Sequence, residues 1–105
     1  MTLSEEALQK HEQAGKIASE VREEMRRRIR VGMPIIDVCE RTESLIRVKG
    51  GKPAFPCNVS VNEIAAHYTS PPKDKRMIPG DSLVKLDIGV HVDGYIADTA
   101  TTICF

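Results

Sequence analysis

The chain has 105 residues, enough for one small domain, and a formal net charge of zero. This balance argues against a basic nucleic-acid-binding domain, and a content of 4% aromatic residues offers no platform for stacking bases. The arginine run at residues 26–28 is interleaved with acids, so we interpret it as a solvated helix face. With 41% hydrophobic and 29% charged residues, and no run of 18 apolar residues, the sequence predicts a folded domain that does not span a membrane.

The cysteines indicate a reducing compartment. Cys39, Cys57 and Cys104 are odd in number and form no C-x-x-C pair, which argues against a disulfide framework or a zinc knuckle. The polar N-terminal segment lacks the apolar stretch of a signal peptide, so we expect a cytoplasmic location. Nothing in the sequence marks a base partner for Cys39 or Cys57, and we interpret both as core thiols.

Two amphipathic helices are predicted in the first half of the chain. Residues 4–31 form the first, with Ser4 as its N-cap and Gly32 as its end. Pro34 opens the second helix, which ends at residues 50–51. Each helix has one apolar stripe with steps of three and four residues. The stripes are Ala14, Ile17, Ala18, Val21, Met25 and Ile29, and Ile35, Val38, Cys39, Thr42, Leu45 and Ile46.

The second half predicts an antiparallel sheet. Residues 58–62 alternate in polarity like a strand, and residues 69–82 have the composition of a loop. Residues 83–92 and 95–105 are rich in β-formers and flank the dipeptide at 93–94, Asp-Gly, which is a strong hairpin signal.

A two-residue turn in this hairpin places two acids on one face of the ribbon. Asp87 then faces Ala100 and Gly89 faces Asp98, which makes Asp87 and Asp98 diagonal neighbours about 7–8 Å apart. Gly89 leaves the gap between them open. Two carboxylates repel unless a positive charge lies between them, and a metal pair about 3.5–4 Å apart fits this gap. The alternative is a solvated face on which Lys85 neutralises Asp87.

His67 is the other candidate for chemistry. It follows the segment NEIAA and has three interpretations: a metal ligand, an acid–base group, or an ordinary half-buried histidine. A lone histidine is most often the last of these.

Segments on both sides of the loop resemble the methionine aminopeptidases. Residues 55–69, FPCNVSVNEIAAHYT, are similar to the histidine segment of that family. Residues 85–91, KLDIGVH, and 93–100, DGYIADTA, are similar to its metal-binding hairpin. The AAHYT form resembles type II enzymes, and the short N-terminal segment resembles their archaeal form. The resemblance covers essentially the whole chain.

This resemblance implies an α+β fold, the N-terminal half of a pita-bread (creatinase/aminopeptidase) fold, with two helices packed on an antiparallel sheet that carries a metal-site hairpin. Asp87 and Asp98 match ligands of two divalent metal ions, which can be Co, Mn, Fe or Zn. His67 matches a catalytic, substrate-contacting histidine, and Phe55 matches a wall of the pocket for the methionine side chain. The implied reaction is removal of the N-terminal methionine from nascent proteins by two-metal hydrolysis.

The chain departs from the family pattern because one His and two Glu ligands belong to a C-terminal half that is missing. We therefore expect residues 1–105 to be a single αβ half-domain, truncated at the C-terminus and inactive or nearly so alone. Its expected partners are the missing half, a separate chain or a second copy, with the ribosome nearby. Two alternatives stay open: a non-catalytic pita-bread-like binding protein and a prolidase or creatinase relative. The retained acid pair argues against the first, and the AAHYT segment against the second.

Overall fold

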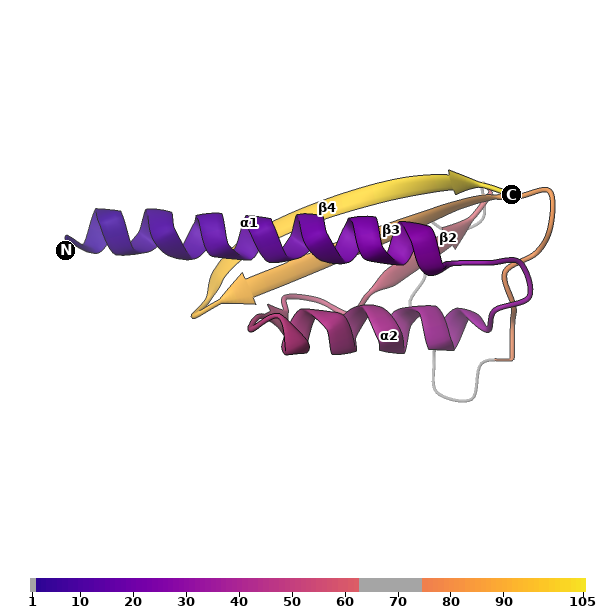
Figure 1. Cartoon of the computed structure of the whole chain (residues 1–105), viewed down its shortest axis with the longest axis horizontal. Helices are drawn as coiled ribbons and strands as arrows, with labels where there is room; N and C mark the ends of the chain where they lie inside the picture. Colours follow the sequence, from indigo (N-terminus) through magenta and orange to yellow (C-terminus); the bar gives the residue numbers. More distant parts are fainter. Residues whose placement is uncertain (1, 63–74) are drawn as a thin grey trace.

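Two helices cover one face of a small antiparallel sheet (Figure 1). The computed structural model describes residues 2–62 and 75–105. The elements are α1 (Leu3–Arg28), α2 (Ile35–Val48), β1 (Lys52–Pro53), β2 (Asn58–Val61), β3 (Leu83–Val92) and β4 (Tyr95–Cys104). Helix α1 packs against β3 and β4, whereas α2 packs against α1, β1 and β2. Neither helix has an apolar stretch long enough to cross a lipid bilayer.

Both helices form where the apolar stripes predict them, but the ends of α1 differ from the prediction. Thr2, not Ser4, is the N-cap: its hydroxyl accepts from the Glu5 backbone N–H, and the Glu5 carboxylate accepts from the Thr2 N–H. This reciprocal pair satisfies two backbone N–H groups at the start of the helix. Ser4 has no acid three residues after it, so it cannot form such a pair. The helix stops at Arg28, because Ile29 adopts extended backbone while its side chain stays buried. Gly32, with φ of 88°, lies in the following turn.

Strand β3 is the centre of the sheet. It pairs along its full length with β4 on one side, and on the other side with β1 at one end and β2 at the other. All of these pairings are antiparallel, as predicted. Strand β1 was not predicted, because two residues that include Pro53 give no alternating pattern. Within the described part of the chain, the outer edge of β4 has no strand beside it.

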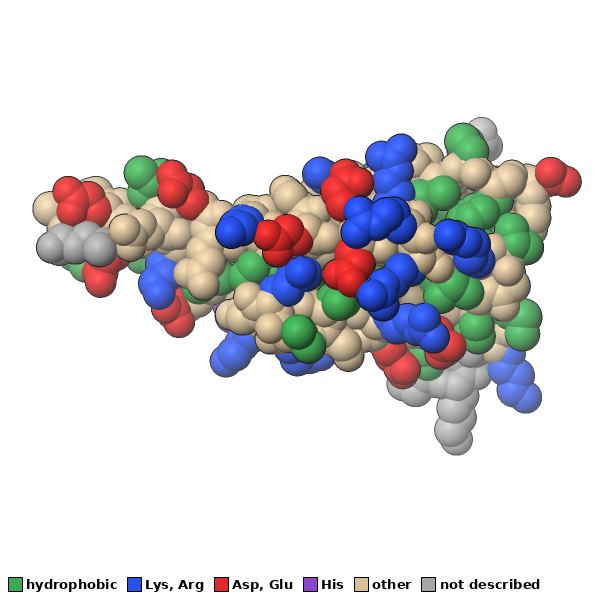
Figure 2. All heavy atoms as spheres, in the orientation of Figure 1, with side chains coloured by type: hydrophobic (Ala, Val, Ile, Leu, Met, Phe, Trp, Pro, Cys, Tyr) green, Lys and Arg blue, Asp and Glu red, His purple; other side chains and the backbone are tan. Residues whose placement is uncertain are grey.

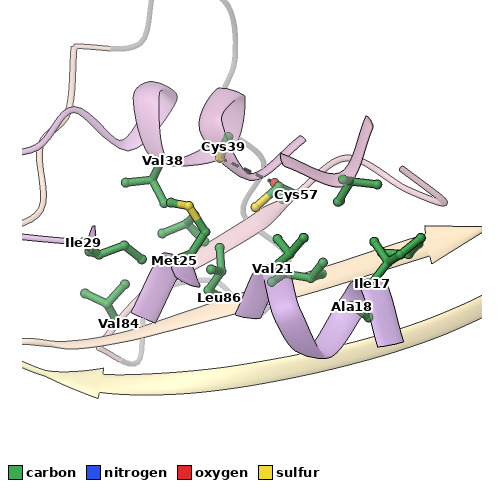
Figure 3. Close-up of a cluster of buried hydrophobic side chains, with 14 of the residues drawn as sticks. Ile17, Ala18, Val21, Met25, Ile29, Val38, Cys39, Cys57, Val84 and Leu86 are labelled. Atoms are coloured by element: carbon green, nitrogen blue, oxygen red, sulfur yellow. Dashed lines mark hydrogen bonds between the residues drawn. The ribbon is translucent and has the colours of Figure 1, made fainter. Parts of the chain in front are cut away.

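The core lies between the helices and the even-numbered residues of β3. Val84, Leu86, Ile88 and Val90 are each at most 1% exposed. They form one cluster with the predicted stripes of both helices (Figure 3). Leu45 packs at the margin of this cluster. The cluster therefore fixes which face of the hairpin turns towards the helices and which turns away.

The described part of the predicted loop is attached to the core. Met77 forms an isolated bridge with Pro34, and Ile78 is 1% exposed. The Ile78 N–H donates to the Met33 carbonyl oxygen, and the Gly32 N–H donates to the Ile78 carbonyl oxygen. Residues 75–82 thus connect the start of β3 to the turn between the helices.

The outer surface of the helices mixes charges of both signs. In Figure 2, Lys and Arg side chains lie among Asp and Glu side chains on the face shown. Arg28 pairs with Glu24 at 2.8 Å, and Lys49 lies 3.4 Å from Glu20. This mixture agrees with interpreting the arginine run as a solvated helix face.

Candidate metal centre

The β3–β4 hairpin sets the geometry of the candidate site. Asp93 and Gly94 have φ of 51° and 86°, so both central residues of the turn are left-handed, as a two-residue hairpin turn of type I′ requires. Asp87 pairs with Ala100, and Gly89 with Asp98. The predicted register is therefore confirmed, and Asp87 and Asp98 are diagonal neighbours on the face turned away from the helices. We call this side of the sheet the open face.

The two aspartates line one pocket of about 480 Å³ on the open face. Its lining residues are Phe55, Asn58, Lys85, Asp87, Asp98, Thr99 and Ala100. The Asp87 side chain is 22% exposed, so it is partly shielded from solvent, whereas Asp98 is exposed. The pocket thus brings together three of the four predicted site residues: Phe55, Asp87 and Asp98.

The gap above Gly89 is not open, which corrects the prediction. A Cβ atom added to Gly89 would overlap the Phe55 ring, with the ring atom Cδ1 only 2.5 Å away. Glycine is required here because the aromatic ring packs directly on its backbone. Phe55 therefore forms an aromatic wall beside Asp98, the residue that pairs with Gly89.

Asp87 also has a cationic neighbour. Lys85 lies two residues away on the same face, and its Nζ is 3.7 Å from Asp87 Oδ1. This ion pair is the contact that the solvated-face interpretation predicts. The Lys85 side chain is 51% exposed, so the pair is screened by water and worth about 0–1 kcal/mol. A contact this weak leaves Asp87 able to exchange Lys85 for another cation.

Asn58 is a lining residue that the sequence did not single out. It pairs with Asp87 across β2 and β3, which places both side chains on the open face. The alternating pattern predicted strand β2, but the pattern contains no signal for the strand that it would pair with. The register between β2 and β3 is therefore the information that was missing.

Comparison with known proteins identifies the family. Residues 9–105 match metallopeptidase family M24. The chain belongs to this family. It is 60% identical over 90 residues to a methionine aminopeptidase of Methanothermobacter thermautotrophicus, and 55% identical over 98 residues to one of Methanocaldococcus jannaschii. These matches cover 86% and 93% of this chain but 30% and 33% of the relatives. The chain thus spans about a third of their length.

The fold agrees with M24 membership. A Xaa-Pro dipeptidase from Bacillus anthracis superposes with a TM-score of 0.85 at 25% identity, and the match covers 98% of this chain and 28% of the dipeptidase. The structural neighbours are pita-bread proteins. The predicted fold class, two helices on an antiparallel sheet within a pita-bread architecture, is therefore confirmed.

M24 is a metallopeptidase family, which implies a divalent metal ion. The described side chains fit part of a ligand set. Asp87 and Asp98 offer carboxylate oxygens on one pocket wall, as divalent ions prefer. Within residues 2–62 and 75–105, no group of three or more His, Cys, Asp or Glu residues is placed to hold a metal. A metal ion held by these two carboxylates would therefore need further ligands from elsewhere.

The histidines do not extend this pair within the described residues. His67 lies outside the described residues, so its predicted role stays a prediction. His91 is on the open face but lines a different hollow, with Lys52 and Arg47. Its Nδ1 accepts from the Gly94 N–H at 3.3 Å, which ties the ring to the hairpin turn.

Strand β4 is held from the helix side next to Asp98. Arg22 of α1 donates through a guanidinium N–H to the Thr99 hydroxyl at 2.8 Å. Thr99 follows Asp98 directly, so this bond attaches the backbone beside the carboxylate to the long helix. Asp98 therefore belongs to a strand segment that α1 holds from the opposite face of the sheet.

Cys39 and Cys57 are buried thiols next to one another (Figure 3). The Cys39 thiol donates to the Cys57 carbonyl oxygen at 3.6 Å. Hydrogen bonding with Cys39, together with burial, raises the pKa of the Cys57 thiol far above its usual range. A thiol that resists ionisation is a poor nucleophile, in agreement with the interpretation of both residues as core thiols.

Proposed function

We propose that this chain supplies the aspartate half of a two-metal site that removes the N-terminal methionine from peptides. The observation that carries the proposal is that Asp87 and Asp98, on one hairpin of the M24 fold, line the same pocket as Phe55. Relatives that are 55–60% identical are named methionine aminopeptidase, which supports this reaction over an Xaa-Pro cleavage.

The residues have distinct proposed roles. Asp87 and Asp98 hold two divalent ions, for which Mn, Fe, Co and Zn are the candidates. When bound, such ions polarise the carbonyl of the scissile bond and activate water. Phe55 offers an apolar surface next to the aspartates, suited to the methionine side chain. His67 is the proposed acid–base group that contacts the peptide.

The chain needs a complement for this reaction. It spans about a third of its relatives' length, and the resemblance to methionine aminopeptidases implies that one His and two Glu ligands come from a further half. We propose that residues 1–105 act as one αβ half-domain and that the missing half, a partner chain or a second copy supplies those ligands. The proposed substrates are nascent peptides in the cytoplasm, near the ribosome.

A chimera tests this function directly. The matching segment of the M. thermautotrophicus relative is replaced by this chain, and methionine release from a Met-Ala-Ser peptide is measured with added Mn²⁺ or Co²⁺. We expect release that a chelator abolishes, and a loss of at least about 100-fold in the Asp98→Asn variant because a metal ligand is removed. Asp81→Asn is the matched control, since Asp81 is exposed outside the pocket and Asn tolerates its φ of 49°.

The outcomes separate the alternatives. A folded, metal-binding chimera that cleaves Xaa-Pro peptides but not Met-Ala-Ser would support the prolidase-like alternative. A folded chimera that binds no metal would support the non-catalytic alternative. Equal activity in the Asp98→Asn and Asp81→Asn variants would contradict the assignment of Asp98.

A further inference from the structure

Lys85 is the one basic side chain lining the aspartate pocket among the described residues. Its Nζ lies 3.7 Å from Asp87 Oδ1, and the remaining lining residues besides the two aspartates are uncharged. The lining side chains therefore supply two carboxylates and one ammonium group. A divalent ion that binds the Asp87 carboxylate therefore comes close to the Lys85 ammonium group.

We propose that Lys85 is a built-in counter-ion that competes with the metal for Asp87 and so lowers the metal affinity of the site. The inference rests on the proposed function, because it takes Asp87 and Asp98 as ligands. It assigns Lys85 a role in setting metal occupancy.

The exposure of Lys85 explains how both cations are accommodated. Its side chain is 51% exposed and its contact with Asp87 is long for an ion pair, so the flexible stem can turn towards solvent when a metal binds. The ammonium group still remains near the pocket, since its backbone lies two residues from Asp87 on the same face. Repulsion across about 6 Å in a largely aqueous medium corresponds to roughly a tenfold loss in affinity for a divalent ion without salt, and to about threefold at physiological ionic strength.

Sheet geometry supplies a matched control. Lys52 pairs with His91 across β1 and β3, which places it on the open face, four residues further along β3 than Asp87. At about 3.3 Å per residue this separation is about 13 Å, beyond the Debye length of about 8 Å at physiological salt. The same substitution at Lys52 therefore removes a charge from the same face without changing the field at the aspartates.

The test is a Mn²⁺ titration of the chimera with the M. thermautotrophicus relative, which adds the proposed remaining ligands, with free ion measured by its electron paramagnetic resonance signal. Lys85→Met and Lys85→Gln remove the charge in two ways, Lys85→Arg retains it, and Lys52→Met is the control. At physiological ionic strength we expect Lys85→Met and Lys85→Gln to bind Mn²⁺ about threefold more tightly than the wild type. Lys85→Arg and Lys52→Met should match the wild type. In 0.5 M KCl the difference should shrink, because salt screens the repulsion.

Other results overturn the inference. Unchanged or weaker binding in both neutral variants, while the wild type binds Mn²⁺, would refute the role of Lys85 and leave the proposed function intact. Tighter binding in Lys85→Arg as well would show that side-chain shape, not charge, is responsible. Absence of Mn²⁺ binding in every folded variant would overturn both this inference and the assignment of the aspartates as ligands.

Discussion

The two faces of β3 differ in the burial and in the polarity of their side chains. The even-numbered residues from Val84 to Val90 are buried under the helices, whereas the odd-numbered Lys85, Asp87 and His91 place polar side chains on the open face. One strand therefore contributes to the core through alternate residues and to the candidate metal centre through the residues between them. We expect fold stability and site chemistry to be separable by mutation at adjacent positions.

The largest effect is expected on the covered face. Leu86 is 0% exposed in the centre of the core, so Leu86→Ala leaves a cavity and should lower the free energy of unfolding by about 3 kcal/mol. Leu83→Ala makes the same chemical change on the open face, where the side chain is 50% exposed, and should cost about 0.5 kcal/mol or less. Urea unfolding followed by circular dichroism measures both. Similar losses for the two variants would break the distinction between the faces.

A smaller effect is expected where the open face is packed rather than solvated. Gly89→Ala places a methyl group in the Phe55 ring and should destabilise the chain by about 1–3 kcal/mol. In the Phe55→Ala background the same substitution should cost much less, because the obstructing ring is gone. A double-mutant cycle from urea unfolding measures this coupling. Additive effects would mean that the ring does not rest on Gly89 in solution.

The smallest effect is expected at the hairpin turn, outside both the core and the aspartate pocket. The Lys10 ammonium lies 2.8 Å from the Asp93 carboxylate and lowers the pKa of Asp93, while the pKa of Lys10 is raised. A lowered carboxyl pKa stabilises the fold above the unfolded pKa of about 3.9, and this contribution is lost as pH falls through the folded value. Asp93→Asn keeps a residue that tolerates φ of 51° but removes the charge.

Thermal unfolding between pH 2 and pH 7 checks this prediction. The wild type should be slightly more stable than Asp93→Asn at pH 5–7, and the two curves should converge below about pH 4 as Asp93 is protonated. A constant difference across this range would contradict an ion-pair origin. High salt should also reduce the difference at pH 7, since the ion pair lies at the surface, with the Lys10 side chain 36% and the Asp93 side chain 70% exposed.

Local signals in the sequence were sufficient for the hairpin and the helices. Asp93 and Gly94 specify a two-residue turn, and a two-residue turn fixes the pairing of Asp87 with Ala100. The stripes of both helices were recognisable because one face of each is buried by a single core. The N-terminal end of α1 was less predictable, since the choice of Thr2 over Ser4 as the N-cap depends on one reciprocal hydrogen-bond pair.

Contacts between distant segments were not predictable from these patterns. Nothing in the sequence around Phe55 indicates that its ring covers Gly89, because the two residues meet only after β2 and β3 pair. The position of Asn58 opposite Asp87 depends on the same pairing. His67 lies outside the described residues, so its place relative to the aspartates is still a prediction from family resemblance.

The short turn at Asp93–Gly94 has a consequence for the order of folding. Asp87 and Asp98 belong to one continuous hairpin, so their approach requires only local chain closure. Isolated hairpins close in about 1–10 μs, faster than contacts between distant segments generally form. We therefore expect the acid pair to come together early, before Phe55 reaches Gly89 and before the helices settle on the sheet. The carboxylates then meet while still hydrated, and their mutual repulsion opposes strand pairing beyond the residue pairs next to the turn.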